Sequence, residues 1–401
     1  MKKICLTLVG IYMMVLHAIG QYEDKDTTFY VSKPLQVEEV NLISSYYSQN
    51  GDHSAITGGI GTERVIDLSN GLDITWVGTD AKNRKNTLVG GFGFDVHSSA
   101  SSAYVSTTGA SKKGGVRIYP SLDWTIDNAK KGTSMGLGVY LSEEYNYSSF
   151  GIHASYSKKT HNNGEFTGKL TGYFDRVKMI YPSEFVQVAT VTSASGGGES
   201  KAKIPTNPRV SATASLSFSQ VINQRTQGLI MLDGVIQSGY LGLPFHRVYF
   251  KDGSPAIEKL PTERYKLPIG VRLNYFLGDR IILRSYYRYY TDSWGLTANT
   301  ASLEVPYKIT PFFSVAPFYR YYQQTAIKYF APFEVHTEAD PYYTSNYAYS
   351  AFSSQFFGIN FRMAPPKGIS GSLSSLELRY GHYLQTTSLL SDVISINLTF
   401  K

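Results

Sequence analysis

Three residues that could do chemistry together lie close in the sequence: Asp95, His97 and Ser98. In a hydrolytic triad the histidine takes the serine proton and the aspartate orients the histidine. Asp95 and His97 would share one face of a strand, but adjacent positions rarely give triad geometry. We therefore interpret the three residues as a hydrogen-bonded cluster at the rim of a strand, and we expect no catalytic residues.

Metal and cofactor sites are not expected either. The eight histidines are scattered without a His-Glu-x-x-His motif, and the single cysteine, Cys5, excludes a disulfide scaffold or a cysteine-based metal site. The glycine-rich stretches 58–61 and 90–93 resemble phosphate loops, but no helical pattern follows them. Basic residues are spread along the chain, so we expect no nucleic-acid partner.

The N-terminus has the features of an export signal. A lysine pair precedes an apolar run over 4–16, which is too short to cross a bilayer as a helix. Small residues then occupy the two positions that a signal peptidase recognises. We predict a signal peptide over 1–20, cleavage before Gln21, and a polar periplasmic tail over 21–36.

The elements that position any site are strands, because residues 37–401 alternate between apolar and polar side chains. In the last predicted strand, Ile394, Ile396 and Leu398 share one face. Counting gives about sixteen such strands, many near the ~9–11 residues that a tilted strand needs to cross a membrane. They are expected over 37–48, 70–79, 86–97, 115–125, 133–143, 149–158, 165–177, 208–221, 227–240, 264–277, 279–290, 296–308, 311–323, 349–363, 372–385 and 391–400.

Loop lengths indicate which face points outward. Alternation also fits a soluble β-sandwich, whose apolar face is buried, whereas a membrane barrel turns that face to lipid. All long loops follow odd-numbered strands, and connections after even-numbered strands are short, as in outer-membrane barrels. The predicted fold is all-β: a closed antiparallel transmembrane β-barrel over 37–401, with short periplasmic turns and long extracellular loops. The long loops are 49–69, 98–114, 178–207, 241–263 and 324–348, and the short turns include 223–226, 278–279 and 308–309.

Aromatic residues near the strand ends support this fold. We expect Trp76 and Trp124 near the short-turn ends and Trp294 at the long-loop rim. The tyrosine-rich stretches 286–290 and 319–322 also lie toward the outer ends. Amphipathic rings favour the headgroup level, so the pattern predicts two aromatic girdles. We predict the outer membrane of a Gram-negative bacterium as the location.

Five blocks carry a resemblance to a known family. Together they resemble a family of bacterial, Bacteroidota-type outer-membrane β-barrels catalogued as domain of unknown function 3570. The resemblance covers nearly the whole mature chain and implies a barrel in the outer membrane, but no activity and no site residues. The blocks are Tyr46–Ala55 (YYSQNGDHSA), Phe94–Ser101 (FDVHSSAS), Ser238–Phe245 (SGYLGLPF), Tyr287–Gly295 (YRYYTDSWG) and Tyr319–Gln324 (YRYYQQ).

The polar strand faces, turned inward, would line a lumen. A barrel of about sixteen strands leaves room for water unless loops fill it, and an arginine-rich wall would favour anions. The alternative is that these arginines pair with acids as a structural ladder. The predicted pore-lining residues are Arg264, Arg272, Arg284, Arg288, Arg320, Arg379, Asp95 and Asp233.

Three classes of function fit the pattern. We favour a porin-like pore for small polar or anionic solutes, which the loops 178–207 and 241–263 could narrow by folding inward. The alternatives are a non-conducting scaffold or accessory barrel of an outer-membrane complex, and a barrel enzyme at the membrane rim. Expected partners are outer-membrane lipid, the barrel assembly machinery during biogenesis and, for a scaffold, other outer-membrane or periplasmic proteins.

Overall fold

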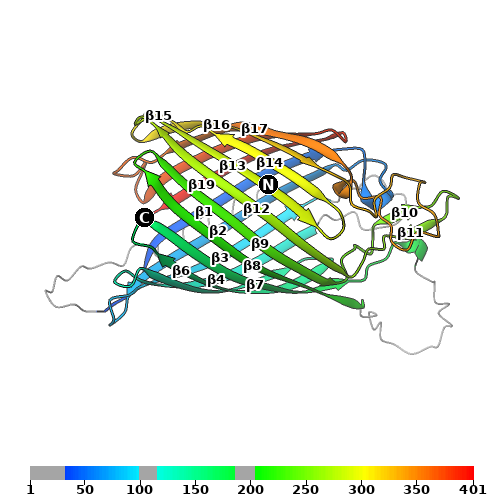
Figure 1. Ribbon diagram of the computed structural model, residues 1–401, viewed down its shortest axis with the longest axis horizontal. Helices are drawn as coiled ribbons and strands as arrows, with labels where there is room; N and C mark the ends of the chain where they lie inside the picture. The colour runs from blue at the N-terminus through cyan, green and yellow to red at the C-terminus, as the bar shows by residue number, and fades with distance from the viewer. Residues whose placement is uncertain (1–31, 99–114, 186–203) are drawn as a thin grey trace.

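The computed structural model describes residues 32–98, 115–185 and 204–401, and its strands form one cylinder (Figure 1). The predicted signal peptide and the tail up to residue 31 lie outside the described residues. None of the described helices is long and apolar enough to cross a membrane. The short 3-10 helices are η1 (Ala55–Thr57), η2 (Ser183–Phe185) and η3 (Tyr347–Tyr349).

The strands follow the predicted pattern closely. In chain order they are β1 (Lys33–Asn50), β2 (Val65–Thr79), β3 (Lys85–His97), β4 (Gly115–Asn128), β5 (Thr133–Glu143), β6 (Tyr147–Lys159), β7 (Gly164–Lys178), β8 (Thr206–Asn223), β9 (Thr226–Gly239), β10 (Arg247–Tyr249), β11 (Pro255–Ile257), β12 (Glu263–Leu277), β13 (Ile281–Asp292), β14 (Thr297–Glu304), β15 (Tyr307–Thr310), β16 (Phe313–Gln324), β17 (Phe352–Met363), β18 (Leu373–Gln385) and β19 (Leu389–Phe400).

The cylinder is closed. Neighbouring strands pair antiparallel in chain order, and β1 pairs with β19 from Val40 opposite Phe400 to Asn50 opposite Leu390. Because β14 and β15 share one place between β13 and β16, the barrel has sixteen strand positions. Closure leaves no unpaired backbone edge facing hydrocarbon, which offers no hydrogen bonds. The predicted fold is therefore confirmed.

Two local predictions are wrong. The predicted strand 296–308 is split into β14 and β15 at Pro306, which has no N–H to donate to the ladder. The predicted turn at 308–309 lies inside β15, and the chain turns instead at Pro311–Phe312, where Thr310 Oγ1 accepts from the N–H of Phe313 at 3.0 Å. The structure also starts β1 at Lys33, inside the segment 21–36 assigned to the tail.

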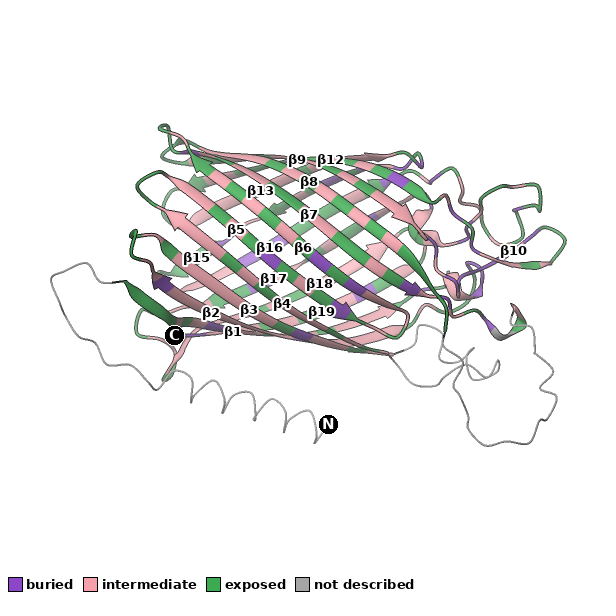
Figure 2. Ribbon diagram, turned by 90° about the horizontal axis from the view of Figure 1, so that it is seen from below, coloured by how far each residue is buried: buried purple, intermediate pink, exposed green. Residues whose placement is uncertain are grey.

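Alternation gives the barrel an apolar outer surface. In β5 the side chains of Met135, Leu137 and Leu141 are 59%, 51% and 51% exposed, and exposed and less exposed residues alternate along most strands (Figure 2). A soluble protein would bury such a face, whereas a membrane barrel turns it to lipid. The long loops and the β10–β11 hairpin lie at the end opposite to the C-terminus (Figure 1).

The outward aromatic residues follow the predicted girdles only in part. Tyr287, Tyr289, Tyr319 and Tyr321 are exposed on the outer face, with Tyr287 and Tyr319 at mid-strand and Tyr289 and Tyr321 nearer the long-loop end. Trp294 is only 2% exposed, so its predicted girdle role is wrong. It packs against Leu260, Leu296 and Ile327 and donates its indole N–H to the carbonyl oxygen of Glu263 at 2.8 Å. The loops cover this ring and remove it from the membrane surface.

Candidate functional site

Five arginines line one sector of the lumen, between β12 and β18. Register places Arg272 opposite Tyr286, Tyr286 opposite Ser302, and Ser302 opposite Arg320. Their sequence neighbours, such as Val271, Leu273, Tyr319 and Tyr321, are exposed on the lipid side, so these residues face inward. We call this sector the arginine wall; it consists of Arg272, Arg284, Arg288, Arg320 and Arg379.

Two arginines of the wall share one carboxylate. Arg284 Nη1 lies 2.9 Å from Glu304 Oε1, and Arg379 Nη1 lies 3.2 Å from Glu304 Oε2. Arg379 reaches β14 from β18, across β16 and β17. These two arginines therefore follow the structural-ladder alternative.

The other three arginines are uncompensated. Among the described residues, Arg272, Arg288 and Arg320 form no ion pair. Arg288 Nε is buried and has no hydrogen-bond partner there. The guanidinium of Arg320 lies over the ring of Phe356 at 4.9 Å and that of Arg272 over Tyr286 at 5.8 Å, contacts that leave the donors at the guanidinium edge available.

The lumen is not filled beside this wall. Arg272 and Arg320 face inward at mid-strand and yet are exposed. An inward side chain can be exposed there only if it borders open space. The wall therefore presents its charges to a solvent-accessible interior.

Two glycines shape the wall. Gly358 of β17 lies opposite Gly381 of β18, and a Cβ at Gly381 would lie 2.4 Å from the ring of Phe356. The missing side chains leave room for the rings of Phe318 and Phe356. The Arg379 guanidinium lies over Phe318 at 3.9 Å, so the aromatic layer supports the arginines.

The remaining predicted lining residues lie elsewhere. Arg264, at the long-loop end of β12, forms a buried pair with Asp292 at 2.5 Å. Asp95 on β3 accepts from Tyr119 Oη at 2.8 Å and lies 3.9 Å from Arg117 Nη1. Asp233 lies on β9, opposite Ser215. None of these three belongs to the arginine wall.

The residues considered for a triad have separate partners. His97 Nε2 lies 3.7 Å from Glu144 Oε1, and Ser98 Oγ accepts from the N–H of Ile66 at 2.9 Å. Neither contact joins the histidine to the serine. Within residues 32–98, 115–185 and 204–401, no group of three histidine, cysteine or acidic side chains could hold a metal ion.

A motif that recurs at the long-loop ends of the strands was not predicted from the sequence. At the long-loop ends of three strands a tyrosine hydroxyl donates at 2.6 Å to the side-chain oxygen of the glutamine two residues later. The glutamine amides then anchor loops: Gln324 Nε2 donates to the carbonyls of Ala348 and Ser350 at 3.0 and 2.6 Å. The repeated Tyr-x-Gln spacing was the available signal. The pairs are Tyr47–Gln49, Tyr322–Gln324 and Tyr383–Gln385.

The long loops are joined above this motif. Glu258 accepts from Thr344 Oγ1 at 2.5 Å and from the N–H of Leu243 at 3.0 Å, and His246 Nδ1 lies 3.4 Å away. Burial by itself would raise the pKa of Glu258, but His246, Thr344 and the Leu243 N–H together hold that pKa below its ordinary value. The carboxylate thus joins the loops 240–262 and 325–351.

A second contact extends the loop assembly. Arg247 is 7% exposed, pairs with Glu184 and donates to the carbonyl oxygen of Ile56 at 2.6 Å. It thereby joins the loops that follow β1, β7 and β9. The loop after β9 also packs inward, because Leu260 contacts the cluster that includes the inward Tyr290 and Tyr322.

A closed barrel with an apolar outer surface and a charged interior is an outer-membrane-type β-barrel. The chain belongs to the family described as protein of unknown function (DUF3570), whose sequence profile matches residues 18–389. This match confirms the family that the five blocks suggested. The Bacteroidota-type origin stays a prediction. Among curated proteins, none matches this chain.

Solved outer-membrane structures show a distant likeness. A crystal structure of OpdQ from Pseudomonas aeruginosa has 8% identity and a TM-score of 0.42, covering 93% of this chain and 99% of that chain. OpdK from Pseudomonas aeruginosa, solved with vanillate, has 8% identity and 0.40, covering 90% and 98%. A bacterial polysaccharide outer membrane secretin has 8% identity and 0.44, also covering 90% and 98%. At scores below 0.5 the fold assignment rests on the closed strand ladder.

Proposed function

We propose that this protein is a porin-like pore for small polar or anionic solutes in the outer membrane of a Gram-negative bacterium. The observation that carries the proposal is the set of uncompensated inward arginines, Arg272, Arg288 and Arg320, beside open lumen space. Side chains whose only role was to hold the barrel together would be paired, as Arg284 and Arg379 are.

The physical basis is electrostatic focusing. A lumen wall of one charge sign within a low-dielectric membrane raises the local concentration of counter-ions. Guanidinium groups also bind carboxylates and phosphates in a bidentate manner, which gives selectivity beyond charge. The anion would meet the arginine wall after passing the loop assembly.

The test is ion selectivity in a planar bilayer under a salt gradient. We expect the wild-type pore to prefer anions, and Arg288→Ala and Arg320→Ala to shift the reversal potential toward zero. Lys82→Ala is the matched control, because it removes the same charge from the exposed β2–β3 turn. An unchanged reversal potential in both arginine variants would defeat the selectivity proposal.

The joined loops favour one alternative, a non-conducting scaffold. The contacts of Glu258 and Arg247 hold several loops together at the mouth, which also suits a partner-binding surface. Folded protein that opens no channels in the bilayer and co-purifies with other envelope proteins would support the scaffold. The proposal treats the chain as a non-enzyme, and a hydrolytic activity lost in His97→Ala would contradict that.

The location has its own test. Purified protein from outer-membrane fractions should begin at Gln21 on N-terminal sequencing if the leader is removed as predicted. A mature chain that retains the first twenty residues would contradict the cleavage site.

A further inference from the structure

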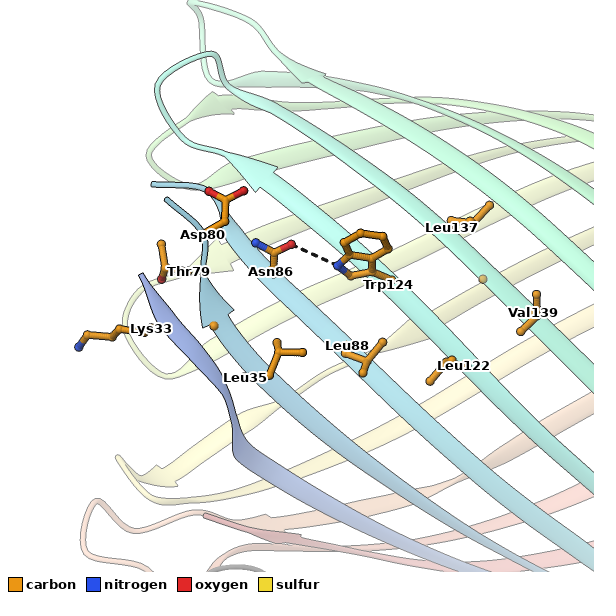
Figure 3. A pocket seen from close by; sticks show the side chains of 12 residues that line it. Lys33, Leu35, Thr79, Asp80, Asn86, Leu88, Leu122, Trp124, Leu137 and Val139 are labelled. Carbon is orange, nitrogen blue, oxygen red and sulfur yellow. Dashed lines mark hydrogen bonds between the residues drawn. The ribbon is translucent and has the colours of Figure 1, made fainter. Parts of the chain in front are cut away.

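A groove of about 480 Å³ lies on the outer surface near the short-turn rim, over β1 to β5 (Figure 3). Leu88, Leu122, Leu137 and Val139 form its apolar wall. Leu122 and Leu137 are 46% and 51% exposed. Strand alternation places these side chains on the lipid side, so the groove opens toward acyl chains.

The irregular start of β1 forms one side of the groove. The register of β1 against β2 shifts between Lys33 and Gln36, and Leu35 projects beside Leu88 (Figure 3). Gly78 of β2 makes this approach possible, because a Cβ there would lie 2.8 Å from the carbonyl oxygen of Lys33. Because Gly78 has no side chain, the backbone at Lys33 can lie close to β2, at the edge of the apolar groove.

The rim end of the groove is cationic. Lys33, Thr79, Asp80 and Asn86 lie there. The charge of Asp80 is neutralised by Arg84, whose Nη2 is 2.7 Å from Asp80 Oδ2. Lys33 forms no ion pair within the described part of the chain. Its ammonium group is therefore available to an anion.

The neighbouring groups suit the headgroup level of a bilayer. Trp124 Nε1 donates to Asn86 Oδ1 at 3.2 Å, so the polar edge of the indole points toward the rim (Figure 3). Tryptophan takes this orientation at membrane interfaces. Further cations are exposed nearby: Lys82 in the β2–β3 turn, Lys85 at the start of β3, and Lys130 and Lys131 in the β4–β5 turn. The surface is thus apolar toward the middle of the membrane and positively charged at the short-turn rim.

We propose that this groove is a binding site for one anionic phospholipid of the periplasmic leaflet. One acyl chain lies along Leu88, Leu122 and Leu137, and the phosphate contacts the Lys33 ammonium group. Charge complementarity favours an anionic headgroup, because a basic rim attracts net negative charge and gains little from a zwitterion. This inference depends on the membrane-spanning fold and is independent of whether the lumen conducts.

Native mass spectrometry of the detergent-purified full chain tests the site. The probes are phosphatidylglycerol and phosphatidylethanolamine with the same acyl chains. We expect one phosphatidylglycerol to be retained in preference to phosphatidylethanolamine. Lys33→Gln should lower its retention about fivefold, the effect expected for one cation near a charged headgroup. Leu137→Trp, which fills the groove, should lower retention of both lipids.

Lys367→Gln is the matched control, because Lys367 lies in the exposed β17–β18 turn at the same rim, away from the strands that line the groove. Heat-modifiable migration on a gel shows that each variant is folded. Equal retention in Lys33→Gln and Lys367→Gln, or no preference between the two lipids, would overturn the proposal.

Discussion

Arg264 and Asp292 form an ion pair at the mouth of the barrel, with Arg264 Nη2 2.5 Å from Asp292 Oδ2 and both side chains almost fully buried. The carboxylate also accepts from Tyr290 Oη at 2.8 Å and from the N–H of Trp294 at 2.9 Å. One acidic side chain thus fixes both Arg264 and the β13–β14 turn. The Trp294 ring lies 4.3 Å from the guanidinium and helps to bury the pair.

Asp292→Ala should therefore be strongly destabilising. Removing one partner leaves a buried guanidinium unpaired, and we expect a loss of about 3–5 kcal/mol in the free energy of unfolding. Urea unfolding in lipid vesicles, followed by tryptophan fluorescence, measures the loss. Glu338→Ala, in an exposed turn, should change stability by only about 0.5 kcal/mol. A similar small effect for Asp292→Ala would contradict the role of the pair.

Glu304→Gln should increase anion selectivity. Glu304 neutralises Arg284 and Arg379, so its substitution leaves two more guanidinium groups uncompensated beside the lumen. The expected shift of reversal potential is opposite in sign to that of Arg288→Ala. Both variants are measured under the same salt gradient, so the two shifts of reversal potential can be compared directly. Shifts of the same sign would show that Glu304 does not act through these arginines.

Ile396→Arg should impair membrane insertion. Ile396 is 40% exposed on the lipid face of β19, and an arginine near the bilayer midplane costs about 2–4 kcal/mol. The readout is the folded fraction in a heat-modifiability gel after refolding into vesicles. Asn397→Arg, one residue later and facing the lumen opposite Glu377, should fold normally. If both variants fold equally well, the assignment of these two positions to the lipid face and the lumen face of β19 is wrong.

Gln324→Ala should loosen the η3 segment. The substitution leaves the carbonyls of Ala348 and Ser350 without their side-chain donor, which costs about 1–3 kcal/mol locally. Hydrogen–deuterium exchange over residues 346–350 should become faster. Gln323→Ala, one residue earlier on the opposite strand face, is the control. If both variants exchange alike, the Tyr-x-Gln pair does not anchor the loop.

The loop assembly should loosen in acid through Glu258. Its folded pKa is depressed, so its contribution to stability is complete above the unfolded value of about 4.3 and is lost as pH falls through the lower folded pKa. Limited proteolysis with an acid-active protease should cut the loops 240–262 and 325–351 faster as pH falls below about 4. Glu258→Gln should remove this pH dependence; if the dependence persists, other groups control the loops.

The alternation of residues by itself determined the sixteen strand positions, because a strand's two faces are set by a local period of two. The alternation of long and short connections indicated that the apolar face points outward. The five sequence blocks indicated the family. Pro306 carried a signal that the prediction of one unbroken strand over 296–308 missed, since proline cannot donate to a ladder.

Only the tertiary structure decided which arginines are compensated. Glu304 and Arg379 are 75 residues apart and meet across two intervening strands, and Trp294 is covered by loop residues such as Ile327. These contacts depend on register, barrel closure and loop packing, which bring distant segments together. A local period cannot encode such distances, so the sequence predicted a charged lumen but not its pattern of paired and free arginines.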